Sequence, residues 1–170
     1  MINIVLFEPE IPVNTGNIMR TCVATNSRLH LIKPLGFKLD EKSIKRSGVN
    51  YTEDCDYTLY EDIDDFFNKN EGEFYYLCRY GKKPHTSFDY SDKDKNLYLF
   101  FGKESTGIPP KYLKPHLNKV MRIPMSDKVR ALNLSNCVAI MVYEVLRQQD
   151  YPNLYFKEPH KSENFIEESE

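Results

Sequence analysis

Three segments of the chain combine glycine, asparagine and charged residues at spacings that suit the binding of a ligand. The first covers residues 14–20, where Asn14 and Gly16 open an expected helix and Arg20 follows one turn later. Backbone amides at a helix start, together with a nearby guanidinium, suit contact with a phosphate or a ribose. Helix capping by Asn14 and a solvated Arg20 would explain the same residues. This segment alone leaves both interpretations open.

The second segment, residues 102–109, follows an apolar stretch that is expected to form a strand. Gly102 and Gly107 flank Glu104 and Ser105, and glycine lets the backbone approach a ligand closely because it carries no Cβ. A plain strand-to-helix turn would use similar residues. The segment therefore indicates a ligand loop only in combination with the others.

The third segment, residues 123–135, leads into an apolar helix. Pro124 ends the preceding strand because it has no amide donor, and Asn133 or Ser135 can cap the helix that follows. Apolar residues then recur at i, i+3, i+4 and i+7, namely Val138, Met141, Val142 and Val145. Further apolar neighbours widen this stripe to most of the circumference. Such a helix must be covered on several sides, either by its own core alone or by its core together with another subunit.

The remaining pattern predicts alternating strands and helices. Strands are expected at residues 2–7, 29–32, 57–60, 73–78, 97–101 and 120–123. Helices are expected from Asn14 onwards, at residues 63–68, at residues 112–117 and along the apolar segment that ends near Arg147. This alternation is typical of an α/β fold with parallel strands, in which ligands bind at the carboxyl ends of the strands.

Two basic segments have a structural and a functional interpretation each. Residues 79–85 follow an expected strand and suit an ordinary exposed loop, although Tyr80 or His85 could stack on a nucleobase. Residues 33–51 hold five bases against two acids. This excess suits either a solvated helix face or attraction of phosphate groups.

Composition and charge limit the class of protein. At 170 residues the chain suits one domain, expected over residues 1–156, before an acidic, disordered tail at 157–170 with five acids and two bases. The net charge of −2 argues against bulk electrostatic coating of nucleic acid.

A cytoplasmic location is expected, because the sequence shows neither a basic leader nor an apolar run of membrane-spanning length. The four cysteines lack metal-ligand spacing, so reduced thiols and no metal are expected.

The three segments together carry a specific resemblance. They read Asn14-Thr15-Gly16-Asn17-Ile18-x-Arg20, then Phe101-Gly102-x-Glu104-x-x-Gly107, then Ile123-Pro124-Met125 with Arg130-x-Leu132-Asn133-Leu134-Ser135. In this order they closely resemble the motifs of SPOUT-class RNA ribose 2′-O-methyltransferases, which use S-adenosylmethionine. Within that class the chain is most similar to the minimal, TrmL-like members that modify the wobble nucleotide of tRNA. The resemblance extends from Met1 to about Asn153.

The resemblance implies a Rossmann-like α/β fold whose C-terminal segment is threaded into a trefoil knot. It also implies a homodimer in which the helix after Asn133 packs against the partner. S-adenosylmethionine is the implied methyl donor, without a metal. The implied cofactor contacts, largely through backbone, are Leu77, Cys78, Gly102, Ile123, Ala131 and Leu132. Ala131 departs from the pattern, because these enzymes more often carry serine there.

The implied chemistry is attack of a ribose 2′-hydroxyl on a sulfonium methyl group. Relatives suggest Arg20, reaching across the dimer, as the catalytic residue. A guanidinium keeps its proton, so stabilising the developing alkoxide or holding the adjacent phosphate suits Arg20 better than a role as a simple base. Asn14, Arg20 and Tyr143 are the implied contacts to RNA, which would be the anticodon stem-loop of a tRNA. The alternatives are a knotted RNA-binding protein with little catalysis, and the same reaction on another RNA such as ribosomal RNA.

Overall fold

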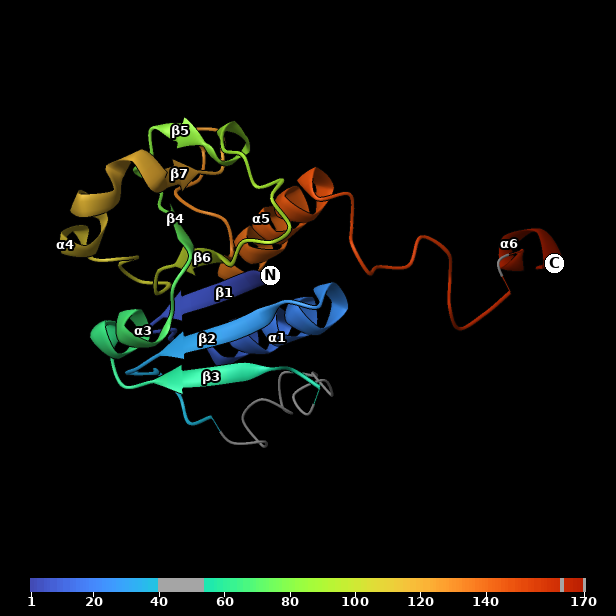
Figure 1. The fold of residues 1–170 in the computed structure, drawn as a ribbon, viewed down its shortest axis with the longest axis horizontal. Coiled ribbons are helices and arrows are strands. Elements are labelled where there is room, and N and C mark those ends of the chain that lie inside the picture. The colour runs from blue at the N-terminus through green and yellow to red at the C-terminus, as the bar shows by residue number, and fades with distance from the viewer. Residues whose placement is uncertain (40–53, 163, 170) are drawn as a thin grey trace.

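The computed structural model describes residues 1–39, 54–162 and 164–169 and shows one parallel sheet (Figure 1). In the described chain the sheet has seven strands in the order β3-β2-β1-β6-β4-β7-β5, and each neighbouring pair is parallel. The strands are β1 (Ile2–Phe7), β2 (Arg28–Ile32), β3 (Tyr57–Tyr60), β4 (Glu73–Leu77), β5 (Lys83–Pro84), β6 (Leu97–Phe101) and β7 (Val120–Arg122). The expected α/β fold with a parallel sheet is confirmed.

Helices cover both faces of the sheet. They are α1 (Pro12–Thr25), α3 (Ile63–Lys69), α4 (Pro110–Leu113), α5 (Leu134–Gln148) and α6 (Phe165–Glu168), with the 3-10 helices η1 (His85–Ser87) and η2 (Lys114–Lys119). Helices α1 and α5 pack against each other on one face, whereas α3 and α4 contribute to the core on the other face (Figure 1). The path of the backbone through the implied knot stays a prediction.

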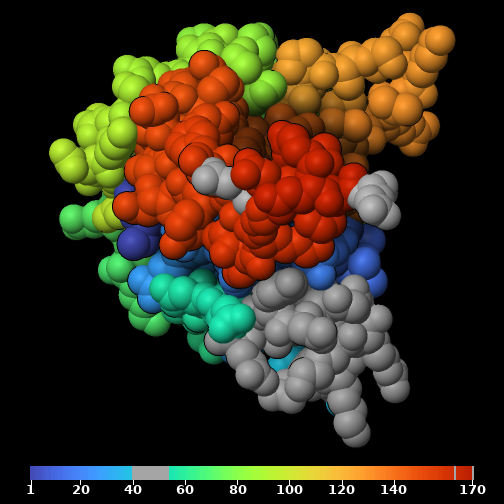
Figure 2. All heavy atoms as spheres, turned by 90° about the vertical axis from the view of Figure 1, so that its right-hand side faces the viewer, coloured from blue at the N-terminus to red at the C-terminus, as the bar shows by residue number. Residues whose placement is uncertain are grey.

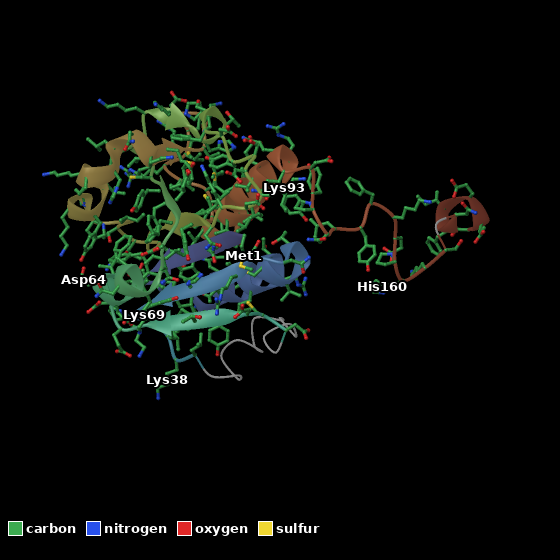
Figure 3. All side chains as sticks on the ribbon, in the orientation of Figure 1. Met1, Lys38, Asp64, Lys69, Lys93 and His160 are labelled. Carbon is green, nitrogen blue, oxygen red and sulfur yellow. The ribbon has the colours of Figure 1, made fainter. Side chains whose placement is uncertain are left out.

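The sequence of β1 explains its central place. All six of its residues are buried, as expected for a parallel strand that is covered on both faces. Ile4 and Leu6 pack on the side of α1 and α5, while Val5 and Phe7 pack on the side of α3. This alternation follows from the two-residue period of a strand. Charged side chains such as those of Lys38, Asp64 and Lys93 project outwards instead (Figure 3).

Helix α1 begins earlier than the sequence predicts. We expected Asn14 to open it, but the helix starts at Pro12, and the backbone amides of Asn14 and Thr15 donate to the Ile11 carbonyl. Proline is favoured at a first helical position, because its missing amide would be unpaired there anyway. The side chain of Asn14 is therefore not needed as a cap.

Other boundaries also differ. The expected loop at residues 79–85 contains β5, which pairs with β7 at the edge of the sheet. The helix expected at residues 112–117 is split into α4 and η2, and η2 is kinked at His116. Strands β4 and β7 each end one residue before their expected ends, while α6 forms inside the expected tail and lies apart from the sheet (Figure 1). In the view from the side on which the tail extends, the red C-terminal residues lie at the front (Figure 2). The domain division at residue 156 stays a prediction.

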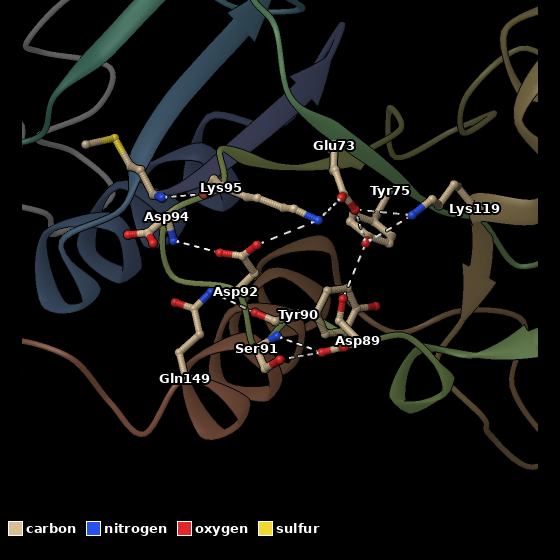
Figure 4. A network of polar contacts seen from close by, with 11 residues as sticks. Glu73, Tyr75, Asp89, Tyr90, Ser91, Asp92, Asp94, Lys95, Lys119 and Gln149 are labelled. Atoms are coloured by element: carbon tan, nitrogen blue, oxygen red, sulfur yellow. Dashed lines mark hydrogen bonds and ion pairs between the residues drawn. The ribbon is translucent and has the colours of Figure 1, made fainter.

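A polar network fastens the amino-terminal edge of the sheet (Figure 4). The Glu73 carboxylate, at the start of β4, accepts hydrogen bonds from Lys95 Nζ at 2.6 Å and from the Tyr75 hydroxyl at 2.7 Å. Lys119 Nζ donates to the same carboxylate at 3.3 Å. These bonds, led by that from Lys95, lower the pKa of Glu73 to about 2. The loops that follow the strands lie at the opposite, carboxyl-terminal edge of the sheet.

No helix in the described ranges is long and apolar enough to cross a membrane.

One buried histidine, His30, lies between polar side chains of two neighbouring strands. His30 is 1% exposed, and its ring nitrogens lie 2.8 Å from the Tyr60 hydroxyl and 3.1 Å from Asn3 Oδ1. Burial, with a smaller contribution from the charge of Arg28, lowers the pKa of His30 to about 4. The imidazole is therefore neutral in the folded protein at pH 7.

We expect the free energy of unfolding to fall as the pH drops from 6.5 to 4. In that range the unfolded chain binds a proton at His30 that the folded chain does not, which amounts to roughly 3 kcal/mol over the interval. Urea titrations at steps between pH 7.5 and 4.5 measure this slope. His30→Gln, as the control, should be less stable at pH 7.5 but nearly flat over the same steps. Equal slopes for both proteins would contradict the assignment to His30.

Candidate functional site

A cavity of about 880 Å³ lies at the carboxyl-terminal edge of the sheet, among the loops that follow β4, β6 and β7. Its size and place are those of a pocket for a nucleoside-sized ligand in an open α/β sheet. The six residues expected to contact a cofactor all line it: Leu77, Cys78, Gly102, Ile123, Ala131 and Leu132. That they bind a cofactor stays a prediction, but the fold brings all of them to one cavity.

A chain of side-chain hydrogen bonds joins the three sequence motifs at this cavity. The Glu104 carboxylate accepts from Asn14 Nδ2 at 2.9 Å and from the Glu10 amide at 2.8 Å. Asn14 Oδ1 in turn accepts from Asn133 Nδ2 at 2.9 Å. Asn133 Oδ1 caps α5 by accepting from the Ser135 amide at 2.9 Å, which confirms one of the two expected caps. Asn14 of the first motif thus links Glu104 of the second motif to Asn133 of the third.

The loops after β1 and β6 also hold each other reciprocally. The Glu10 carboxylate accepts from the Ser105 amide at 2.8 Å and from its hydroxyl at 2.9 Å. These two bonds lower the pKa of Glu10. Lys103 Nζ lies 2.7 Å from the carboxylate of Glu8. Neither acid was expected at the site, because their only local signal is that they lie a few residues before the first motif.

The glycines of the second motif are needed because the loop folds against itself. A Cβ on Gly102 would lie 2.2 Å from the carbonyl carbon of Gly107, so only hydrogen fits there. Gly107 has a φ of +73°, a conformation that favours glycine, and its amide donates to the Lys103 carbonyl at 2.8 Å. The close approach that Gly102 permits is to backbone of the same loop, and the expected approach to a ligand stays a prediction.

Positive charge surrounds the cavity. Its lining includes the cations Arg79, Lys103, Lys114 and Arg122, against the acid Glu104. The Nε atom of Arg122 is buried and has no hydrogen-bond partner in the described part of the chain. This excess of positive charge suits a ligand that carries phosphates. Across the described ranges, His, Cys, Asp and Glu side chains form no group of three or more that could hold a metal ion.

Two expected site residues lie away from the cavity of their own chain. Arg20 and Tyr143 are not among the described residues that line it. Arg20 is exposed on α1, about 9 Å along the helix axis from Asn14, which does line the cavity. Tyr143 is 47% exposed on α5, the helix that packs against α1. Asn14 itself is 5% exposed, and both ends of its amide are used within the chain.

The basic segment at residues 33–51, for which a solvated helix face and phosphate attraction were both open, lies mostly outside the described residues, including Lys42, Lys45 and Arg46. Of its described bases, Lys33 pairs with Glu61 at 2.7 Å.

A parallel sheet with a nucleoside-sized cavity at its carboxyl edge places the chain among the open α/β proteins, which bind their ligands at that edge. Comparison with known families narrows this class, because residues 1–143 match one family over most of the chain. The chain belongs to the SpoU rRNA Methylase family.

Individual relatives agree with this assignment. The tRNA (cytidine(34)-2'-O)-methyltransferase of Escherichia coli (strain K12) is 42% identical over 161 residues, which are 93% of this chain and 100% of the relative. A solved Bacillus anthracis structure is 50% identical, with a TM-score of 0.88, and the match covers 93% of this chain and 100% of the other. A structure described as giving insights into 2-OH methylation of C/U34 on tRNA is 34% identical, with a TM-score of 0.80, and covers 88% and 97%. The resemblance found in the motifs is confirmed.

Proposed function

We propose that this chain transfers a methyl group from S-adenosylmethionine to the ribose 2′-hydroxyl of the wobble nucleotide of a tRNA. The observation that carries the proposal is the meeting of all three motifs at one cavity, joined through Glu104, Asn14 and Asn133, in a member of a methylase family. The choice of tRNA as the substrate and of the wobble position as the target is supported by the similar proteins that act on nucleotide 34 of tRNA. Such an enzyme would act in the cytoplasm, where its substrate is found.

The cavity suits a nucleoside cofactor held largely by backbone. Its lining combines apolar side chains, such as Leu77 and Leu132, with the close-packed backbone at Gly102. A backbone contact at residue 131 would make the alanine there compatible with binding. When bound, the cofactor supplies a methyl group that is already activated on a sulfonium. The residues of this chain then need only bind it, exclude water and orient the ribose.

Arg20 is the proposed catalytic residue, and it would act on the cavity of a partner subunit. Its position outside the cavity of its own chain supports this arrangement. At the partner's cavity its guanidinium would stabilise the 2′-oxygen as it loses its proton, or hold the adjacent phosphate. Tyr143 is proposed to contribute to the RNA-binding surface, whereas the buried Asn14 would support that surface by holding the loops through its bonds to Glu104 and Asn133.

A homodimer through α5 is the proposed assembly. The stripe of this helix, including Met141 and Val142, is buried in the core of its own chain, but Ile140 is 37% exposed and Tyr143 47% exposed. On the neighbouring α1, Val13 is 49% exposed. Apolar side chains on two adjacent helices form a surface that a second copy can cover.

The function is tested by incubating the purified chain with S-adenosylmethionine and unmodified tRNA, then locating the methyl group by nucleoside and fragment mass spectrometry. We expect one 2′-O-methyl group, at position 34, with equal yield in a chelator. A substrate with a 2′-deoxy sugar at position 34 should stay unmodified. If the chain methylates ribosomal RNA but not tRNA, the proposed substrate is wrong and the reaction type stands. Tight RNA binding with neither cofactor binding nor methyl transfer would favour a binding protein.

Glu104→Gln should weaken both the fold and the binding of S-adenosylmethionine. Glutamine loses the negative charge, and its amide nitrogen would face donors such as Asn14 Nδ2. We expect a loss of roughly 1–3 kcal/mol in the free energy of unfolding, and weaker cofactor binding because Asn133 is no longer held through Asn14. Urea unfolding and calorimetry measure the two effects. Glu158→Gln, in the exposed tail, is the matched control. Unchanged stability and affinity in Glu104→Gln would contradict the role of the hydrogen bonds that join Glu104, Asn14 and Asn133.

A further inference from the structure

We propose that Tyr80, backed by Arg79, is a stacking platform on which a nucleobase of the RNA substrate lies at the mouth of the cavity. The proposal rests on the proposed function and adds a residue that determines how the RNA is held.

The geometry of Tyr80 is that of a prepared platform. Its side chain lines the cavity and yet is 74% exposed, which is unusual for a large aromatic ring. The guanidinium carbon of Arg79 lies 4.7 Å from the ring centroid, so a cation covers one face of the ring. The high exposure shows that the ring is otherwise open to an incoming group. A planar base could therefore stack on it, and the adjacent guanidinium could meet a phosphate.

The backbone around Tyr80 is fixed. The Gly81 amide donates to the Cys78 carbonyl at 2.9 Å, and the Cys78 amide donates to the Met121 carbonyl at 2.9 Å. A Cβ on Gly81 would lie 2.3 Å from the Met121 carbonyl carbon, so the loop is packed directly against β7. A ring held on such a loop loses little conformational entropy when a base stacks on it.

The charges nearby favour RNA as the source of the base. Lys82 and Lys83 follow Tyr80 and are exposed, while Lys114 and Arg122 line the same cavity. Proteins that hold single-stranded RNA commonly combine exposed aromatic rings with cations that follow the backbone. The half-buried Leu77 and Cys78 lie deeper in the wall than the far more exposed Tyr80. We therefore place the cofactor beside Leu77 and Cys78, and the RNA base beside Tyr80 at the mouth of the cavity.

The chain has no tryptophan, so Tyr80→Trp introduces a single fluorescent reporter at the platform. We expect its emission to be quenched by an anticodon stem-loop RNA, with a midpoint that matches RNA binding measured independently. S-adenosylmethionine alone should leave the emission nearly unchanged. Tyr155→Trp is the matched control, because Tyr155 is 84% exposed but lies in the tail, outside the residues that line the cavity. Its emission should not respond to the RNA.

Kinetics give the second readout. Tyr80→Ala should raise the KM for tRNA roughly ten- to hundredfold, the usual effect of losing one stacking ring, while kcat and the Kd for S-adenosylmethionine stay within about twofold. Tyr80→Phe should behave as the wild type, because it keeps the ring. A wild-type KM in Tyr80→Ala, or absence of RNA quenching, would overturn the proposal. Quenching by the cofactor alone would assign the platform to its adenine. If the wild-type chain methylates no tRNA, the proposed function fails, whereas the fluorescence assay still reports stacking.

Discussion

Arg20→Ala should lower kcat for tRNA methylation by roughly a hundredfold or more, the usual effect of removing one donor that stabilises developing charge. The fold and the affinity for S-adenosylmethionine should stay close to those of the wild type, because Arg20 is exposed on α1 and is not among the described residues that line the cavity. Single-turnover methyl transfer and calorimetry measure the two quantities. Arg20→Lys should recover little activity, since an ammonium lacks the planar fork of a guanidinium.

Mixed dimers test whether Arg20 acts on the partner's cavity. Ala131→Trp would place a bulky side chain in the cavity while leaving Arg20 intact, because Ala131 is exposed and lines the cavity. Dimers that combine Arg20→Ala with Ala131→Trp should regain activity, because one of their two sites would have an open cavity and an arginine from the other subunit. Mixed dimers without activity, after proven subunit exchange, would place Arg20 in the site of its own chain.

Val142→Asp should leave little folded protein. Val142 is fully buried in the core between α5 and the sheet, and an unpaired carboxylate there costs several kcal/mol, a large share of a typical stability of about 5–15 kcal/mol. Circular dichroism and the yield of soluble protein measure the loss. Ile140→Asp is the matched control, because Ile140 lies on the same helix but is 37% exposed. It should fold normally and dissociate into monomers, as sedimentation would show.

The two outcomes separate core packing from assembly. The stripe that contains Val142 suggests from sequence that this helix is shared between the core and the partner, and the structure assigns the stripe itself to the core. A folded Val142→Asp protein would mean that α5 is misplaced in the core. A stable Ile140→Asp dimer would mean that the subunits meet at another surface.

Local patterns were sufficient to predict the strands other than β5, and to place the ligand loops at the edge where the cavity lies. Buried parallel strands such as β1 and β6 are continuous apolar runs, and their order along the chain places the loops that follow them at one edge. The same patterns could not predict that Glu10 would bond to Ser105, because nothing local to either residue specifies a partner so far along the chain. The short pairing of β5 with β7 was missed for the same reason. Periodicity likewise contains no information about whether a backbone is threaded into a knot.

The central position of β1 has a consequence for how the protein is made. Its neighbour on one side is β2, which follows soon after it, but its neighbour on the other side is β6, with Ile2 paired to Leu97. A ribosome releases the chain from its N-terminus, so the backbone donors and acceptors along one edge of β1 stay unpaired until Phe101 has left the exit tunnel. Uncovered strand edges of this kind are the surfaces on which nascent chains aggregate and which chaperones protect. Nascent chains arrested before residue 101 should therefore bind chaperones and resist proteolysis poorly, and the bond between Glu10 and Ser105 could form only after Ser105 has emerged as well.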